Sequence, residues 1–428
     1  MNAPGPKEAL ALDCDAETFE LIHQLEACYG PVVRIEASNH ERPVWLLSDP
    51  DDIRRILVNQ HRNYVKGVGF ERVEMLLGNG IIVSDGAFWR RQRTMIQPAF
   101  SRGNMPRYFD MIKAVTLRLR EQWRALAASG EPLDITTCMS EYALEIILRA
   151  IFSDDMERFF GAEEDHPFAF LTEDPTRNLM VAMKFRQLLK RVRALIAHRR
   201  ETGERPFDLL SMMMDARASR TQEAMSDREL VDEVATMIIA GHETSAGTLN
   251  WAWYLMSSHA ESRRLLRAES ERVCPDGELH YEQLSELTYT QQVLDETLRL
   301  YPPVWLFTRR ALADDEIGGF SVAAGDNLFF SPYLVQHLPR FWDAPEAFKP
   351  ERFSPDAQAP MQAFFPFSQG PRRCIGEFFS YVEMKTHLAL MSREFRLRHI
   401  DDQPVRLEPA INLRTLHSIN MTIEALDP

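Results

Sequence analysis

The sequence predicts a mainly α-helical protein with a small β region. Four long segments carry apolar residues at three- and four-residue spacing, a longer apolar helix follows a capping box, and short β-branched runs are confined to two stretches. No repeat, low-complexity tract or linker divides the 428 residues, although length alone would allow two or three domains. We therefore predict a single large domain over residues 1–428, in which residues 1–30 form an N-terminal extension.

The individual elements follow from these patterns. Residues 32–35 and 44–47 are short apolar runs separated by a polar stretch, which predicts a β-hairpin. Ser48 is the predicted N-cap of the helix that follows, because Pro50 stands in its first turn. The amphipathic helices are expected at residues 105–128, 140–152, 179–200 and 207–216, and further short strands at residues 316–322 and 328–330.

Composition excludes several classes of protein. The formal net charge is −14, whereas a nucleic-acid-binding protein usually needs a basic face. The five cysteines are odd in number and widely spread, without a C-x-x-C pair, which favours a reducing cytoplasm over a disulfide scaffold or a zinc site. The N-terminus lacks a basic start followed by an apolar run, and no stretch approaches the ~20 apolar residues of a membrane helix. We therefore predict a cytoplasmic protein without a membrane anchor.

The longest predicted helix has a polar interruption. Ser226 and Glu229 form a capping-box pattern, and the apolar helix after them runs to about residue 256, a length of about 40 Å. Its middle reads AGHETS, residues 240–245. Two interpretations fit. Either Thr244 leaves the backbone ladder in a local bulge and Gly241 lets a flat ligand approach, or a kink is satisfied by Ser/Thr bonding back to the helix.

The second unusual segment is FSQGPRRCIG, residues 367–376, which precedes an apolar periodic helix. Cys374 therefore stands at the end of a Gly/Pro loop, just before a helix N-terminus. Helix amides and the dipole at that end favour a thiolate, Gly376 keeps the backbone close to the sulfur, and Arg372 and Arg373 add positive charge. A lone cysteine is usually a small buried hydrophobe, but the pattern around this one favours a metal-ligating thiolate.

Four motifs resemble those of the cytochrome P-450 superfamily, and they follow one another in the same order as in that family. Residues 240–245 resemble its oxygen-activation helix, and residues 296–299 match its E-x-x-R helix. Residues 350–353 match its PERF segment, and residues 367–376 match its haem loop, F-x-x-G-x-R-x-C-x-G. The resemblance runs from residue 31 to the C-terminus. It implies the cytochrome P-450 fold as one haem domain, in a soluble, bacterial-type member.

The resemblance implies a cofactor and its contacts. The cofactor is haem b, with Cys374 as the axial iron ligand and dioxygen as co-substrate. Further residues implied to contact the haem lie in residues 240–245 and 367–376, namely Ala240, Gly241, Phe367 and Gly376. The implied propionate partners are Trp89, Arg93, Arg372 and Arg309, because the planar donor fork of arginine suits carboxylates. Arg310 is the alternative to Arg309, and a solvated surface charge is the alternative for each arginine.

Catalytic and structural roles are implied as well. Thr244 and Glu243 are the implied catalytic residues, because the family uses this pair to deliver protons while dioxygen is activated. His242 is expected to be structural. Glu296, Arg299 and Arg352 are implied to form a structural triad, the alternative being a surface ion pair of little energetic value.

Electrons are expected to come from other proteins, namely a separate ferredoxin or flavodoxin with an NAD(P)H-dependent reductase. The reason is that the chain has no G-x-G-x-x-G fingerprint for a flavin or nicotinamide cofactor. Arg90, Arg91 and Arg373 form either a basic docking patch for this partner or scattered solvent-facing charges.

The expected substrate is a hydrophobic small molecule: a fatty acid, a terpenoid or carotenoid, or a polyketide-like compound. The candidate pocket residues, each of which could equally belong to the ordinary core, are Phe70, Leu76, Met237, Val304 and Leu306. The distal roof, residues 152–197, looks short and holds an acidic-to-proline break at residues 163–175. The predicted reaction is hydroxylation or epoxidation. A peroxygenase, decarboxylase or coupling reaction, or a non-enzymatic haem sensor, is the alternative.

Overall fold

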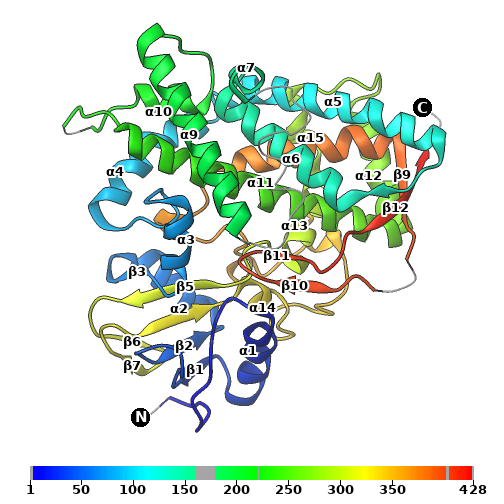
Figure 1. Cartoon of the computed structure of the whole chain (residues 1–428). Coiled ribbons are helices and arrows are strands. Elements are labelled where there is room, and N and C mark those ends of the chain that lie inside the picture. Colours follow the sequence, from blue (N-terminus) through cyan, green and yellow to red (C-terminus); the bar gives the residue numbers. More distant parts are fainter. Residues whose placement is uncertain (1–2, 161–178, 220, 402–403, 427–428) are drawn as a thin grey trace.

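The computed structural model describes residues 3–160, 179–219, 221–401 and 404–426. Helices form the larger part of the molecule, and small sheets border them (Figure 1). The observed fold class is therefore the predicted one, mainly α with a small β region. No helix in the described part of the chain is long and apolar enough to cross a bilayer.

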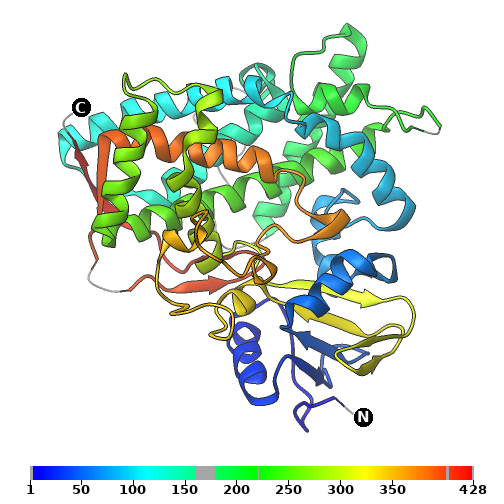
Figure 2. The same cartoon turned by 180° about the vertical axis from the view of Figure 1, so that it is seen from behind.

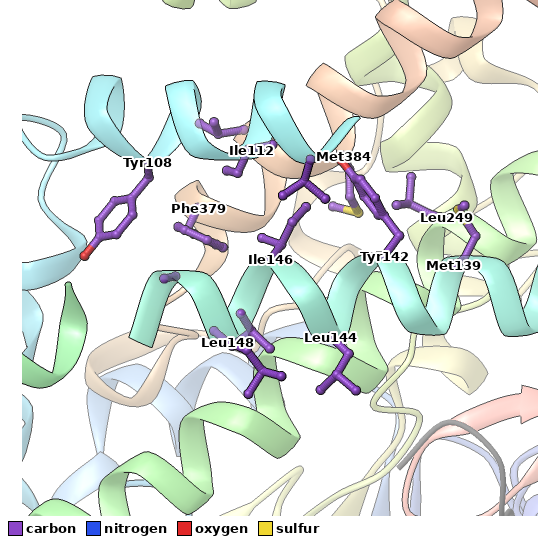
Figure 3. Close-up of a cluster of buried hydrophobic side chains, with 14 of the residues drawn as sticks. Tyr108, Ile112, Met139, Tyr142, Leu144, Ile146, Leu148, Leu249, Phe379 and Met384 are labelled. Atoms are coloured by element: carbon purple, nitrogen blue, oxygen red, sulfur yellow. The ribbon is translucent and has the colours of Figure 1, made fainter. Parts of the chain in front are cut away.

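Four helices build the centre of the helical part: α5 (Met105–Ser129), α6 (Ile135–Phe152), α11 (Asp227–Ser258) and α15 (Glu377–Glu394). Helix α11 packs against α6, and α15 packs against α5. Figure 3 shows the core between them, where Ile146 and Tyr142 of α6 meet Phe379 and Met384 of α15. Seen from behind, α15 runs beside α5 and α12 (Ala260–Val273), and both helices pack against it (Figure 2).

The other helices surround this centre. They are α1 (Ala16–Tyr29), α2 (Pro50–Arg54), α3 (Phe70–Leu77), α4 (Gly86–Ile96), α7 (Asp155–Phe160), α9 (Leu179–Thr202), α10 (Leu209–Asp215), α13 (Thr288–Leu300) and α14 (Pro332–Gln336). The predicted helices at residues 105–128, 140–152, 179–200 and 207–216 are confirmed as α5, α6, α9 and α10. Observed boundaries differ from the predicted ones mostly by one to five residues.

The largest sheet has five strands in the order β1-β2-β8-β5-β3. These strands are β1 (Val32–Ile35), β2 (Val44–Leu47), β8 (Asn327–Phe330), β5 (Phe307–Ala311) and β3 (Tyr64–Lys66). The hairpin of β1 and β2 is antiparallel, as predicted, whereas β2 pairs with β8 in parallel. The smaller sheets contain β4 (Leu133–Asp134), β9 (Phe395–His399) and β12 (Asn420–Ala425); β6 (Asp315–Ile317) and β7 (Phe320–Val322); and β10 (Leu407–Pro409) and β11 (Leu413–Thr415).

One predicted helix cap is wrong. The N-cap of α2 is Asp49, whose Oδ1 accepts the backbone N–H of Asp51 at 2.9 Å. Ser48 faces the interior instead, where its hydroxyl donates to Glu26 at 3.3 Å and accepts from Arg340 at 2.9 Å. Both residues are good caps by type, so only the side-chain direction distinguishes them.

The distal roof is described only in part. The predicted acidic-to-proline break at residues 163–175 lies outside the described residues. Its described neighbours are α7 and α9, and both are tied to α10 by Arg199 of α9, which bonds Asp155 and Asp208. Arg199 also donates to the carbonyl of Phe152, the last residue of α6, so the described part of the roof is bonded to the helical centre.

Candidate active site

The loop before α15 holds Cys374 in a fixed backbone frame. Gly370 has a φ of +71°, and a Cβ built on it would lie 2.1 Å from the carbonyl oxygen of Leu57. Only glycine fits both conditions. The loop closes through the Cys374 N–H, which donates to the carbonyl of Phe367 at 3.0 Å. Two residues later Gly376 caps α15, so the sulfur lies at the predicted helix N-terminus.

The surroundings of the sulfur shift the pKa of the Cys374 thiol in both directions, and the net shift is upward. Burial raises the pKa of the Cys374 thiol, whereas the backbone N–H groups of Gly376 and Glu377 and the charge of Arg93 lower it. The side chain of Cys374 nevertheless keeps accessible surface, unlike Cys274, which is fully buried and donates to the Ser270 carbonyl. Cys374 is therefore no core hydrophobe, and its sulfur is open to a further group.

Arg93 and Trp89 of α4 reach this loop in different ways. Nη1 of Arg93 donates to the carbonyl of Arg373 at 3.0 Å, so this arginine braces the cysteine loop. The ring of Trp89 lies under the guanidinium of Arg372, whose Cζ is 4.3 Å from the ring centroid. Helix α4 thus contacts the loop at two neighbouring residues, Arg372 and Arg373.

Arg372 belongs to a cationic cluster with Arg309 and Lys66, in which Arg309 is buried and the other two are half-buried. Arg309 is 4% exposed, and burial together with Arg372 lowers its pKa to about 10. Arg372 pairs with Asp85 and donates to the carbonyl of Ser84 at 3.1 Å. Among the residues that the structure describes, Asp85 is the only carboxylate in an ion pair with this cluster. The cluster therefore carries uncompensated positive charge, which suits an anionic ligand.

Sequence reasoning missed Lys66 and left the choice between Arg309 and Arg310 open. Lys66 lies opposite Arg309 in the antiparallel pair of β3 and β5. Burial and the two neighbouring arginines lower the pKa of Lys66 well below its ordinary value. Arg310 is exposed because adjacent strand residues point to opposite faces, so Arg309 is the buried member. Only strand pairing identifies Lys66, and no local motif marks it.

Helix α11 presents a partly accessible face in its otherwise buried middle. Ala240, Glu243 and Thr244 are only half-buried, whereas Ile238, His242 and Ser245 are buried. Residues three and four apart share one helix face, so the accessible residues form a stripe. The predicted capping box of Ser226 and Glu229 begins this helix, as expected.

Of the two interpretations of this polar interruption, the bulge at Thr244 is wrong. Helix α11 is continuous, and the hydroxyl of Thr244 donates to the carbonyl of Ala240 at 2.7 Å. This is the back-bonding alternative. The hydroxyl still lies on the accessible stripe. Its neighbour Glu243 accepts a hydrogen bond from Nδ2 of Asn412, in the loop between β10 and β11.

The two residues between Ala240 and Glu243 are explained by helix packing. A Cβ on Gly241 would lie 2.7 Å from Cδ1 of Ile147, so the glycine allows α6 to approach α11 closely. This packing alone accounts for the glycine, and the implied contact of Gly241 with a flat ligand stays a prediction. His242 is 1% exposed and bonds Ser140 of α6 at 2.8 Å. This agrees with the expected structural role of His242.

The Glu296 network joins α13 to the segment that contains Lys349 and Arg352. Glu296 and Arg299 are both fully buried and bond at 2.7 and 2.9 Å. Arg352 donates to the same carboxylate at 3.2 Å, and the backbone N–H of Lys349 donates at 2.9 Å. The surface-pair alternative is therefore wrong, and the predicted triad is formed.

The five pocket candidates divide into three groups. Met237 and Leu306 pack inside hydrophobic core clusters, which favours the ordinary-core alternative for both. Phe70 and Val304 are half-buried, and the ring centroid of Phe70 lies 4.4 Å from the ammonium of Lys66. The side chain of Leu76 lies outside the described part of the chain.

The predicted basic patch is partly neutralised. Arg91 pairs with Glu229 of α11, and Arg373 pairs with Glu377 at the start of α15. Arg90 is exposed. Net positive charge at this surface is therefore smaller than the count of arginines indicates.

The sequence matches the family model "Cytochrome P450" over residues 8–166 and 165–419. The chain belongs to the cytochrome P450 family. Relatives include cyclooctatin synthase of Streptomyces melanosporofaciens, 31% identical over 96% of this chain and 93% of the relative. Pentalenene oxygenase of Streptomyces avermitilis is 30% identical over 89% and 87% of the two chains. Carotene epsilon-monooxygenase of Arabidopsis thaliana is 27% identical over 92% and 80%. This protein is a cytochrome P450 monooxygenase.

The residues present fit the haem-thiolate cofactor of the family. A dianionic group with two carboxylates matches the cluster of Lys66, Arg309 and Arg372, which has one carboxylate of its own. Cys374, which keeps accessible surface beside this cluster's arginine loop, would supply the thiolate ligand. The family also implies dioxygen as co-substrate, a hydrophobic substrate and an external source of electrons.

Proposed function

We propose that this P450 binds haem b through Cys374 as axial ligand and hydroxylates or epoxidises a hydrophobic terpenoid-like molecule. The observation that carries the proposal is the place of Cys374, which keeps accessible surface just before the N-terminus of α15. The backbone N–H groups of Gly376 and Glu377 and the charge of Arg93 partly offset the rise in its thiol pKa that burial causes. When bound, haem supplies the electron transfer and dioxygen activation that the side chains cannot supply.

The cationic cluster would hold the propionates. Arg309 and Arg372 supply planar donor forks, and Lys66 supplies a point charge beside them. Trp89 keeps the guanidinium of Arg372 in place from below, and Arg93 fixes the loop through the Arg373 carbonyl. Burial strengthens such ion pairs, because the electrostatic attraction between opposite charges is larger where little water screens it.

Two residues of α11 would move protons. The Glu243 carboxylate lies on the accessible stripe, where it can take up a proton and pass it on. The hydroxyl of Thr244, one residue on, can release the Ala240 carbonyl and donate toward the same face. Asn412 would hold Glu243 in position through its amide.

The relatives favour an isoprenoid substrate over a fatty acid or polyketide. Their names give pentalenene and carotene as substrates of two of them, and a third relative is a cyclooctat-9-en-7-ol 5-monooxygenase. Phe70 and Val304, which are half-buried and apolar, are candidates for contact with such a molecule.

The proposed electron donor is a ferredoxin or flavodoxin with its own NAD(P)H-dependent reductase. The chain contains no G-x-G-x-x-G fingerprint in its 428 residues. Arg90 and the partly paired Arg91 and Arg373 would form a weak docking surface, so electron transfer should slow only modestly with salt.

The first experiment is a titration of the ferric protein with isoprenoid hydrocarbons and alcohols, fatty acids and polyketides, monitored at the haem Soret band. A low-to-high-spin shift with isoprenoids, followed by oxygenated product, supports the proposal. A shift with fatty acids or polyketides alone would contradict the proposed substrate class.

The proton-delivery role has a matched control one turn further along α11. Thr248 donates to the carbonyl of Thr244 at 2.9 Å, so Thr248→Ala removes an equivalent back-bond away from the proposed donor. We expect Thr244→Ala to lower the product formed per electron consumed by about tenfold or more, because general acid catalysis is worth at least this much. Equal coupling in both variants would remove Thr244 from the mechanism.

A further inference from the structure

Asp295 is a fixed hydrogen-bond acceptor close to the cysteine loop. It immediately precedes Glu296 on α13, the residue held by Arg299 and Arg352. Oδ1 of Asp295 accepts from the hydroxyl of Tyr381 at 2.5 Å and from Nε2 of Gln291 at 3.0 Å. A carboxylate on such a well-anchored helix can determine the position of the side chain that bonds to it.

Tyr381 connects Asp295 to the cysteine loop. It lies on α15, one turn after Glu377, and its ring packs on the ring of Phe367 with centroids 5.4 Å apart and planes tilted by 52°. The carbonyl of Phe367 accepts the N–H of Cys374 at 3.0 Å. A continuous line of contacts therefore joins Asp295 to the backbone of the proposed ligand.

We propose that Tyr381, held by Asp295, is a positioning residue that fixes Phe367 and thereby sets the reduction potential of the iron on Cys374. This inference rests on the proposed function, because it requires Cys374 to bind haem iron. The potential of a thiolate-ligated centre depends on hydrogen bonds to the sulfur and on the polarity around it. A Phe367 ring that moves would admit water to the sulfur.

The hydroxyl of Tyr381 needs this explanation, because phenylalanine would pack on Phe367 equally well. Burial and the nearby Asp295 carboxylate raise the pKa of Tyr381 well above its ordinary value, so it stays a donor. Burial raises the pKa of Asp295 to about 6. The charged neighbours on α15 are Glu377 and Lys385, and their effects on Asp295 oppose each other.

The experiment compares Tyr381→Phe and Asp295→Asn with Tyr289→Phe in the haem-loaded protein. Tyr289 is a matched control, because it is a partly buried tyrosine of α13 that pairs instead with Ser262. The ferrous carbon monoxide spectrum is recorded first. A missing thiolate-type band in the parent protein would contradict the proposed function itself. A thiolate-type band there allows the potential to be tested separately.

The midpoint potential is then measured by spectroelectrochemical titration. We expect Tyr381→Phe and Asp295→Asn each to raise it, because water donors at the sulfur withdraw electron density from iron. The double variant should shift no further than Tyr381→Phe, since Asp295→Asn only weakens the hydrogen bond that Tyr381→Phe removes. The control should leave the potential unchanged.

The same substitution made in a Phe367→Ala variant tests whether Tyr381 acts on the reduction potential through Phe367. There, Tyr381→Phe should cause no additional shift of the potential. An additional shift would show that Tyr381 does not act through Phe367. Unchanged potentials in both Tyr381→Phe and Asp295→Asn, whether or not the thermal midpoint falls, would overturn the proposal and leave a purely structural pair.

Discussion

Two buried arginines hold different halves of this P450 together. Arg299 bonds Glu296 and the carbonyl of Gln336, whose side chain accepts the backbone N–H of Phe365, two residues before the cysteine loop. Arg199 bonds Asp155 and Asp208, below the described part of the roof. Neither arginine has exposed surface. In each one, all three guanidinium nitrogens donate hydrogen bonds to carboxylate or carbonyl oxygens.

The two networks differ in where the partners come from. The main partner of Arg299 is three residues away on the same helix, so the pair forms a visible pattern in the sequence. Asp155 is 44 residues from Arg199 and lies on another helix. The first network was predicted and the second was not. A buried charge network is visible in a sequence when its partners are local, whatever its energetic importance.

Arg299→Ala should have the largest effect. It leaves Glu296 buried with less compensation, which costs about 3–5 kcal/mol of stability when one member of a buried pair is removed. Because Glu296 also accepts the N–H of Lys349, we expect the loop region to loosen and haem to be lost faster. Denaturant unfolding and haem transfer to an acceptor protein measure the two effects.

Arg299→Lys distinguishes charge from geometry at this position. Lysine keeps the charge but lacks the planar fork that makes two bonds to Glu296. Recovery of most of the lost stability by lysine would show that charge alone matters, contrary to the bidentate interpretation.

Arg199→Ala should cost about 3 kcal/mol, at the lower end of the same range. Asp155 keeps a little exposure and can gain water, and Asp208 retains the N–H of Ser211 at 2.7 Å. Unlike the first variant, this one should leave haem retention unchanged, because its partners lie on α7 and α10. Equal loss of haem in both variants would remove the distinction between the two networks.

The same contrast explains what the sequence revealed of the fold and the site. Hydrophobic periodicity placed the main helices and the hairpin, and fixed spacings identified Cys374 and the Glu296 triad. Lys66 was missed because it joins the cationic cluster only through its pairing with Arg309 across two strands. Met237 and Val304 are both apolar, and only the packing separates a core residue from a half-buried one.

Glu383 shows what happens to a buried carboxyl without an arginine. It lies on α15, and its hydrogen-bond partner in the described part of the chain is the hydroxyl of Ser245, at 3.0 Å. Burial raises its pKa from 4.5 to about 8. Between these values the folded chain keeps a proton that the unfolded chain loses. Stability should therefore fall as pH rises through this window, by about 1.4 kcal/mol per pH unit.

Glu383→Gln should flatten that pH dependence of the thermal midpoint by one proton. Glu233, a second buried carboxyl with a pKa raised to about 8, provides a parallel variant on α11. The combined variant should flatten it by two protons. A slope that Glu383→Gln leaves unchanged would mean that Glu383 is ionised in the folded protein.

Gly241→Ala should have the smallest effect, and it distinguishes the packing role of this glycine from its implied contact with haem. The new methyl would meet Ile147, 94 positions earlier in the chain, at 2.7 Å from its Cδ1 and Cγ1. The flexible end of an isoleucine can shift, so we expect a loss of about 1 kcal/mol, at the low end for overpacking. Ile147→Val removes the Cδ1 atom and should restore much of it in the double variant. Haem content should stay unchanged throughout, whereas a glycine that admitted the haem would lower it in the single and the double variant alike.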